Sequence, residues 1–340
     1  MSAIDISVIV LTYNGRANLM RCLTALQRQR LEPGLRVEIM LADNASSDGS
    51  SEFAVAHFPD VRVVRFETNH GYTGGNNRAA ALAGGDWLVF LNDDTEPDDD
   101  WLAALVRASR LHPATGLLTS RIVFMHDTET LDSAGDEVSR WGGAWKRGHG
   151  QPVSTAPVTE EVFGACGGAF MIRRTLFGSL GGFDEDFFLS HEDVDLSYRA
   201  RLAGERCLYV ADAIVAHAVS ASLGRSSARS VYYGQRNLEW VFVKNTPAAL
   251  LPIALPLHAV YLAAGAAYFL SIGHGRTFFR AKIDALRGIR RVLGARRRVQ
   301  ATRRLPAHAV WRLLSPGFLG VKLREKRADR RLARQSPPQP

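Results

Sequence analysis

The stretch ISVIVLTYNG, residues 6–15, joins a short apolar run rich in β-branched residues to a polar loop. Similar apolar runs follow at residues 37–42, 61–66 and 87–91. Segments with helical periodicity separate these runs, at about residues 17–30, 46–57 and 75–84. Strands that alternate with helices form βαβ units, so the pattern predicts an α/β fold with a mostly parallel sheet flanked by helices.

Polar residues follow each of the four predicted strands. The four clusters, in chain order, are TYNG, DNASSDGS, ETNHGYTGGNN and NDD. In open parallel sheets, ligands bind beyond the carboxyl ends of the strands. We therefore expect the four clusters to meet along one edge of the sheet.

The middle of the chain continues with further predicted elements. Residues 117–125 form a possible strand, and the Gly- and Trp-rich region from there to about residue 160 predicts no regular element. FGACGGAFMIRR (163–174) is typical of a strand, and HEDVDLSYRARLAG (191–204) of an amphipathic helix that ends at Gly204. CLYVADAIVAHA (207–218) predicts another strand, which leads to His217.

The C-terminal part is first apolar and then basic. Residues 247–272 carry no charge and exceed the roughly 20 residues that a bilayer requires, but three prolines and His258 interrupt them. A transmembrane span and a re-entrant or interfacial helix pair are both open. An Arg-rich segment at 276–304 follows, as in stretches that lie on an anionic cytoplasmic leaflet. These features predict three parts, namely a body (1–245), membrane-associating helices (246–305) and a basic flexible tail (306–340).

Charge and cysteine content exclude several protein classes. From residue 273 onward there are 19 Lys and Arg against 3 Asp and Glu, whereas the preceding residues hold 23 against 31. The acidic body and the 26-residue apolar run disfavour a nucleic-acid-binding protein, which Arg runs would otherwise suggest. Three separate cysteines without a CxxC pair argue against a disulfide framework or zinc site. The N-terminus lacks the basic region of a signal peptide, so we expect the body to lie in the cytoplasm.

FLNDDTEP, residues 90–97, places Asp93 and Asp94 at a predicted strand end. A divalent cation held by one or two carboxylates and substrate phosphates would compensate these two charges. The alternative is a solvated turn, and we assign the following acids, Asp98–Asp100, to capping of the next helix.

Three other polar sites in the sequence each allow a structural and a functional interpretation. Asp43 could cap a helix or read a base or ribose beside Thr12 and Asn14. The first turns of the 191–204 helix hold Glu192, Asp193 and Asp195, where acids are favoured by the helix dipole, but one of them could instead be a general base. His217 could be a polar strand-end residue or a metal ligand.

These pieces occur in the order expected of family 2 glycosyltransferases, and their overall pattern resembles the rhamnosyltransferase-like branch. The resemblance covers about residues 5–245 and rests on SVIVLTYNGRANLMRCLTAL, LADNASSDGS, NHGYTGGNNRA, FLNDDTEP, GGAFMIRR, GGFDEDFF, HEDVDLSYRARLAG and VAHAVSAS. It implies a GT-A fold, which is a Rossmann-like, mostly parallel sheet flanked by helices that binds a nucleotide sugar. The apolar and basic C-terminal part also resembles the membrane-associating helices of that branch.

The resemblance assigns roles to single positions. The donor would be contacted by residues from the family's successive loops, which here are Thr12, Asn14, Asp43, Asn76 and Asp93. NDD matches the family's DxD element with Asn92 in place of the first acid, so Asp94 would bind the metal. Asp193 matches the catalytic base, and His217 a histidine that completes the metal site in some relatives.

The activity so implied is inverting, metal-dependent glycosyl transfer. The cofactor would be Mn²⁺ or Mg²⁺, and the donor a nucleotide sugar, with dTDP-rhamnose first and UDP- or GDP-sugars next. The acceptor would be a glycan or polyprenyl-linked compound at the cytoplasmic face of the inner or plasma membrane, where the protein would be peripheral or monotopic, and no nucleic acid would bind. A nucleotidyltransferase is the alternative enzyme, although TYNGRAN is a poor match to its triphosphate loop.

Overall fold

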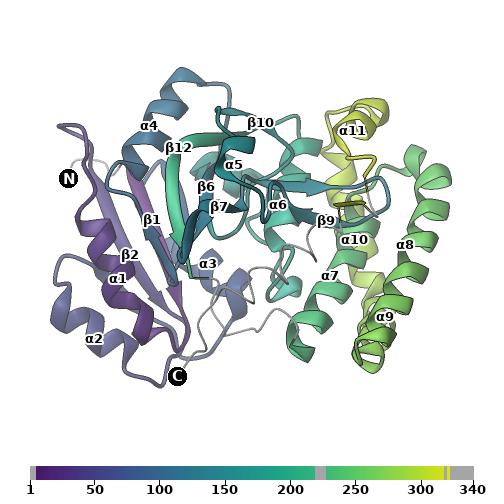
Figure 1. Ribbon diagram of the computed structural model, residues 1–340, viewed down its shortest axis with the longest axis horizontal. Coiled ribbons are helices and arrows are strands. Elements are labelled where there is room, and N and C mark those ends of the chain that lie inside the picture. Colours follow the sequence, from purple (N-terminus) through teal and green to yellow (C-terminus); the bar gives the residue numbers. More distant parts are fainter. Residues whose placement is uncertain (1–4, 219–226, 318–319, 322–340) are drawn as a thin grey trace.

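The computed structural model describes residues 5–218, 227–317 and 320–321 (Figure 1). Its strands are β1 (Ile6–Thr12), β2 (Val37–Asp43), β3 (Arg62–Arg65), β4 (Trp87–Asn92), β5 (Thr95–Pro97), β6 (Leu117–Phe124), β7 (Asp127–Ser133), β8 (Asp136–Val138), β9 (Ala144–Lys146), β10 (Glu160–Val162), β11 (Ala169–Arg173) and β12 (Cys207–His217). Its α-helices are α1 (Arg16–Gln27), α2 (Ser50–His57), α3 (Gly71–Leu82), α4 (Trp101–Leu111), α5 (Arg174–Ser179), α6 (Glu192–Leu202), α7 (Ala228–Asn245), α8 (Leu251–Ser271), α9 (Gly275–Arg287), α10 (Ile289–Ala301) and α11 (Ala307–Leu313). Short 3₁₀ helices cover Val153–Thr155, Glu185–Phe187 and Ala248–Leu250.

The first four predicted strands form a parallel half-sheet. β1 lies between β2 and β4, and β3 continues beyond β2, with every one of these pairings parallel. The predicted helices follow each strand as α1, α2 and α3, and α3 begins four residues earlier than expected. The α/β fold predicted from the sequence is therefore confirmed.

The other half of the sheet is mixed. β11 runs antiparallel between β4 and β6, β12 runs parallel to β6, and β5, β7 and β10 add antiparallel edges. The region for which the sequence predicted no regular element contains β7 and a separate two-stranded ribbon of β8 and β9. β8 and β9 have only three residues each and β7 is mostly polar, so none of them shows the alternation that marks a half-buried strand.

Both faces of the sheet are buried. Along β1, Val8 and Val10 face a core built with α1, α2 and α4, whereas Ile9 faces a second core built with α3, α5 and α6. Successive side chains of a strand point to opposite faces, so a strand covered by helices on both sides has to be apolar throughout. This explains why the strand sequences are continuous apolar runs.

A third core joins α6 to the C-terminal helices, which stand beside one end of the sheet in Figure 1. It contains Val194 and Tyr198 of α6 together with side chains from α7 to Leu314. At its border, the amide of Asn245 donates to Asp195 Oδ1 over 2.8 Å, and Lys244 Nζ lies at the same distance from that oxygen. Residues far along the chain thus pack against α6 and bond to it.

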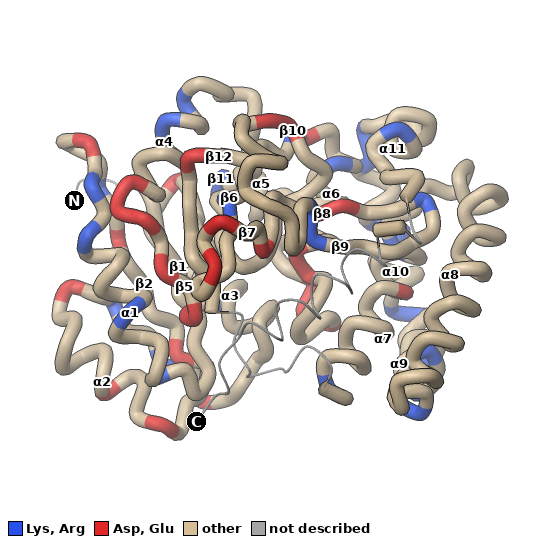
Figure 2. Tube along the Cα trace, in the orientation of Figure 1, with Lys and Arg blue, Asp and Glu red and all other residues tan. Residues whose placement is uncertain are grey.

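The helix α8 is the apolar segment that the sequence singled out, and Figure 2 shows it without a charged residue. Within the described part of the chain, Ala248–Ser271 is the one helical stretch whose length and composition would allow it to cross a membrane, with a mean hydropathy of 1.7. One side of α8 is fixed to the protein, because His258 bonds the Glu239 carboxylate and the Trp141 carbonyl over 2.8 and 2.9 Å.

Candidate functional site

The predicted ligand-binding edge is formed by three parallel strands that end side by side. Thr12 at the end of β1 pairs with Asp43 at the end of β2, and Leu11 pairs with Asn92 at the end of β4. The polar residues that follow these strands therefore share one edge of the sheet, as the sequence predicted. The main-chain carbonyl of Asn92, the position that departs from the family's acid, accepts a hydrogen bond of 2.6 Å from the Thr95 hydroxyl.

Asp93 turns back toward the end of β1. Its Oδ2 accepts a 2.7 Å hydrogen bond from the Thr12 hydroxyl. Burial raises the pKa of Asp93 to about 7, with the Thr12 bond opposing the shift and the neighbouring Asp94 adding to it. A Cβ at Gly15 would lie 2.0 Å from Asp93 Oδ2, so this position has to be glycine for the carboxyl group to fit.

Asn14 and Asp43 fasten the first two loops together. Asn14 has a positive φ of 56°, its N–H donates to Ser46 Oγ over 2.9 Å, and its side-chain oxygen accepts from the Ser47 N–H over 2.8 Å. Asp43 is buried and accepts from the Ser46 N–H and the Ser51 hydroxyl. These bonds tie Asp43 to the loop before α2 and to the first turn of that helix, but the N-cap residue of α2 is a glycine, without a side-chain capping hydrogen bond. The contact of Asn14 and Asp43 with a donor stays a prediction.

Asn76 lies inside α3, where its side-chain amide donates to the Tyr72 carbonyl of its own helix over 3.0 Å. The helix packs closely on the end of β1, since a Cβ at Gly75 would come within 2.6 Å of a Leu11 methyl group. Asn76 is buried in this structure, and its predicted role beside the donor remains untested.

Asp94 and His217, 123 positions apart, meet at the end of the sheet. β5 pairs with β12 so that Thr95 lies opposite His217, which brings Asp94 Oδ1 to 3.2 Å from His217 Nε2. On its other side, His217 Nδ1 lies 2.8 Å from Asp132 Oδ2. Burial opposes a charge on this ring, but Asp132 and Asp94 outweigh it and raise the pKa of His217 to about 9.

Asp132 is the residue of this cluster that the sequence did not reveal. It is fully buried, and it also bonds Lys146 Nζ over 2.7 Å and approaches His149 Nδ1 to 3.2 Å. Although burial opposes ionisation, Lys146, His149 and His217 hold the pKa of Asp132 well below its usual range. Within the polar sequence TETLDSAGDE, this acid had no local pattern that would distinguish it from a solvated one.

Asp193 lies at the start of α6 in a loop with unusual backbone geometry. Ser190 and His191, which lead into the helix, both have positive φ, at 69° and 64°. Asp193 Oδ2 accepts from the Gly167 N–H over 2.7 Å, and Oδ1 from the Val194 N–H over 2.8 Å. Non-glycine residues with positive φ concentrate at functional sites, because the surrounding structure has to offset their strain.

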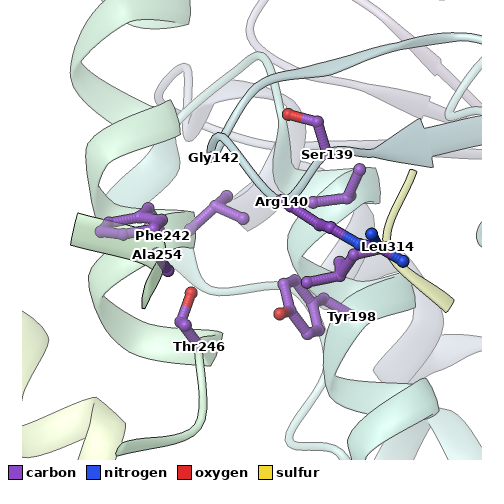
Figure 3. Close-up of a pocket in the computed structure, with 10 residues that line it drawn as sticks. Ser139, Arg140, Gly142, Tyr198, Phe242, Thr246, Ala254 and Leu314 are labelled. Carbon is purple, nitrogen blue, oxygen red and sulfur yellow. The ribbon is translucent and has the colours of Figure 1, made fainter. Parts of the chain in front are cut away.

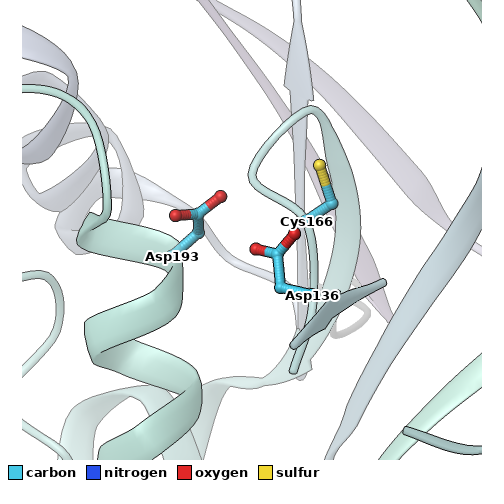
Figure 4. Close-up of side chains that lie close together, drawn as sticks. All are labelled: Asp136, Cys166 and Asp193. Atoms are coloured by element: carbon cyan, nitrogen blue, oxygen red, sulfur yellow. The ribbon is translucent and has the colours of Figure 1, made fainter. Parts of the chain in front are cut away.

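Asp193 has two further ligand-type side chains beside it. One ligand atom each from Asp136, Cys166 and Asp193 lie within 4.8 Å of one another, and Figure 4 shows the two carboxyl groups facing each other. Burial raises the pKa of the Cys166 thiol, so this sulfur is a neutral neighbour. Asp136 also lies in the region that the sequence left without a predicted element.

The acids assigned to capping behave differently from the prediction. Asp100 is the residue before α4, but its side chain makes no capping hydrogen bond. The carboxylates of Asp99 and Asp100 instead pair with Arg30, at 3.3 and 3.1 Å. These exposed ion pairs contribute little to stability, because water screens them.

A small cavity lies elsewhere, between β8, α6, α7 and α8 (Figure 3). Its volume of about 10 Å³ is close to that of one water molecule. The buried Tyr198 hydroxyl on its wall has no hydrogen-bond partner among the described residues. The cavity suits a structural water and has no part in the site at the sheet edge.

The fold is that of a GT-A glycosyltransferase. One solved structure with this fold is S. aureus TarS 1–349 in complex with UDP-GlcNAc, which is 17% identical and covers 91% of this chain and 90% of that one. Another is GalNAc-T7 with UDP, GalNAc and Mn²⁺, which is 21% identical and covers 72% of this chain and 48% of that one. Each superposes with a TM-score of 0.57.

The chain belongs to glycosyl transferase family 2, whose family model matches residues 7–181. Among curated proteins it is similar to the N-acetylglucosaminyl-diphospho-decaprenol L-rhamnosyltransferase of Mycobacterium tuberculosis strain H37Rv. The two are 32% identical over 247 residues, which cover 65% of this chain and 78% of the relative. The enzyme class predicted from the sequence is thereby confirmed, and the nucleotidyltransferase and nucleic-acid-binding alternatives are not favoured.

Proposed function

We propose that the enzyme transfers a sugar, rhamnose from dTDP-rhamnose in the first instance, to a hydroxyl of a lipid-linked glycan acceptor with inversion and with the help of a divalent cation. The observation that carries this proposal is a site in two parts. Asp94 and His217 converge at the sheet edge, and Asp193 is held at the start of α6 by the Gly167 N–H. The relative named above supports both the sugar and the acceptor class by its own activity.

Asp94 and His217 would hold the cation. Two neighbouring ligand atoms on an octahedral Mn²⁺ or Mg²⁺ ion are about 3 Å apart. This spacing fits the 3.2 Å between Asp94 Oδ1 and His217 Nε2. A carboxylate oxygen with an imidazole nitrogen suits Mn²⁺ at least as well as Mg²⁺. When bound, the cation would neutralise charge on the departing nucleoside diphosphate.

Asp193 would act as the general base. It takes the proton of the acceptor hydroxyl as that oxygen forms a bond to the anomeric carbon of the donor. The bond from this carbon to the diphosphate oxygen breaks, and its electron pair leaves with the nucleoside diphosphate. A single displacement from the opposite face inverts the anomeric centre, and no covalent enzyme intermediate is needed.

The donor is tested most directly with a panel of nucleotide sugars. Thermal stabilisation and metal-dependent hydrolysis should single out dTDP-rhamnose over UDP- and GDP-sugars. A panel without any response would contradict the proposed activity.

Asp132→Asn is expected to weaken cation binding by about 10- to 100-fold, since an outer carboxylate fixes the ring and tautomer of a histidine ligand. The Nδ1 bond of 2.8 Å between His217 and Asp132 would be altered while Asp94 stays in place. Calorimetric titration with Mn²⁺ measures the change without requiring turnover. Glu129→Gln, an exposed acid on the same strand, is the control, and equal affinities for the two variants would refute this role.

We also propose that the enzyme lies on the cytoplasmic face of the membrane as a peripheral or monotopic protein. The outer side of α8 and the adjacent side of α9 expose large apolar side chains, at Ile253, Leu255, Val260, Leu270, Phe279, Ile283 and Leu286. Exposed arginines flank the apolar side chains of α9, as in helices that lie in a membrane interface. Because His258 fixes the inner side of α8 to the protein, we favour an in-plane position over a span.

Replacing Phe279 and Leu286 with Glu should release the protein from anionic liposomes, because both changes put charge into the apolar contact. Co-sedimentation is expected to fall at least about fivefold while hydrolysis of the donor in solution persists. Val55→Glu alters a residue of α2 with a comparable exposed fraction of 63% and should leave co-sedimentation unchanged. Full retention of the double variant on liposomes would argue against this surface.

A further inference from the structure

The loop between β10 and β11 holds two carboxyl groups together from two different elements. Asp136 of β8 exchanges main-chain hydrogen bonds with Gly164, its N–H donating over 2.8 Å and its carbonyl accepting over 3.2 Å. Three residues later, the Gly167 N–H donates to Asp193 Oδ2. The same short segment therefore fixes the backbone of Asp136 and the side chain of Asp193.

The loop between β10 and β11 packs closely against Asp193 and the rest of α6. A Cβ at Gly167 would come within 2.9 Å of Asp193 Oδ2, and a Cβ at Gly164 would meet Ser197 of α6 at 2.6 Å. The Ser197 hydroxyl in turn accepts from the Ala165 N–H over 3.0 Å. The contact of loop and helix determines the separation of the two carboxyl groups shown in Figure 4.

The carboxyl groups of Asp136 and Asp193 have oxygen atoms within 4.8 Å of each other. Two carboxylates this close do not both ionise readily, because their repulsion adds to the loss of hydration. Asp136 is 4% exposed, whereas Asp193 is half-buried and has a main-chain N–H bonded to each carboxylate oxygen. Both oxygens of Asp193 thus already accept hydrogen bonds, and a proton on either oxygen would compete with these N–H groups. The proton of the pair therefore belongs on Asp136.

The other charged and titratable groups around Asp136 agree with this assignment. Burial and Asp193 raise the pKa of Asp136 well above its usual range, and the more distant Asp132 adds to the shift. Lys146, opposite Asp136 in the β8–β9 ribbon, opposes it, but its ammonium group is bonded to Asp132. The Cys166 thiol stays neutral, since burial raises its pKa.

We propose that Asp136 is a positioning residue for the catalytic base: a neutral carboxylic acid that donates a hydrogen bond to the Asp193 carboxylate and orients it toward the acceptor hydroxyl. This inference rests on the proposed role of Asp193. The proton of Asp136 stays where it is during transfer, while Asp193 accepts the proton that the acceptor releases.

The presence of this proton can be tested without turnover. Infrared difference spectra of the full chain at neutral pH, wild type minus Asp136→Asn, should contain the carbonyl band of a protonated carboxyl group. Asp212→Asn, which changes an exposed acid paired with Arg107, should give no such band in its own difference spectrum. The proposal would be overturned if no such band depends on Asp136. It would also be overturned if Mn²⁺ or Zn²⁺ bound to the cluster of Asp136, Cys166 and Asp193 and thereby removed the band.

Kinetics then test the positioning role. Asp136→Ala should lower kcat by about 10- to 100-fold, the usual range for a lost hydrogen bond to a charged group, with an unchanged Kd for the donor. Asp136→Asn keeps a neutral donor and should recover at least about tenfold of that loss. If Asn is as harmful as Ala while both variants bind the donor and unfold at the wild-type temperature, the ionised acid is required and the proposal is wrong. The proposed base and the proposed positioning residue fail separately. If Asp193 is not the base, Asp193→Asn remains active, while the Asp136-dependent infrared band of the wild type persists.

Discussion

Asp193→Asn should reduce kcat by about 10³-fold and leave donor binding intact. The amide is nearly isosteric with the carboxylate, but it cannot take the proton from the acceptor hydroxyl, and a positioned base typically contributes 10²- to 10⁴-fold. A 10³-fold loss corresponds to about 4 kcal/mol in the activation free energy. Single-turnover transfer to the acceptor measures the loss, and calorimetry with the nucleotide sugar measures binding.

Asp212→Asn is the matched control for this experiment, because it makes the same chemical change at an exposed acid. It should transfer sugar at the wild-type rate. Unchanged turnover of Asp193→Asn would assign the base to another group. Simultaneous loss of donor binding would instead show that the carboxylate supports the loop containing Gly167, to which it is bonded.

Asp94→Ala should abolish the effect of the metal on donor affinity. Removing the carboxylate leaves His217 as the remaining proposed ligand, and a cation that neutralises a diphosphate contributes several kcal/mol. We expect kcat/KM to fall by at least about 100-fold. In calorimetric titrations, a chelator should weaken donor binding by the wild type and have no effect on the variant.

Glu96→Ala is the control for the metal experiment, since Glu96 is two residues away on β5 and pairs with Arg28. Its donor affinity should still depend on the metal. A wild-type protein that binds the donor equally well with and without a divalent cation would rule out the assignment of Asp94. A metal effect that survives in Asp94→Ala would move the site elsewhere.

The parallel half of the fold could be predicted because its local signals agree. In β1 and β4 most of the residues that face the two cores are apolar, and β1, β2 and β3 each lead through a polar loop into the next helix. The edge that gathers Thr12, Asp43 and Asp93 follows from parallel pairing alone. The catalytic role proposed for Asp193, by contrast, came from the resemblance, because an acid in the first turn of a helix is ordinarily a favourable charge at the helix dipole.

Asp132 and Asp136 could not be predicted, for a different physical reason. Each is buried by contacts distant in sequence: Asp132 by His217 and Lys146, and Asp136 by its proximity to Asp193. Burial of a carboxyl group leaves no periodic signal, since the compensating groups lie on other strands. The meeting of Asp94 with His217 also depends on an antiparallel pairing of β5 and β12 that the sequence did not indicate.

The core shared by α6 and the C-terminal helices limits how the chain can be shortened for solution work. A fragment that stops after Leu250 would lose Tyr261, Ala285, Val292, Val310 and Leu314, which pack in the same core as Val194 and Tyr198. The helix that carries Asp193 would then be loosened, and inactivity of the fragment would say nothing about lipid requirement. Point substitutions on the outer face of α9, in the intact chain, separate membrane contact from the integrity of the catalytic helix.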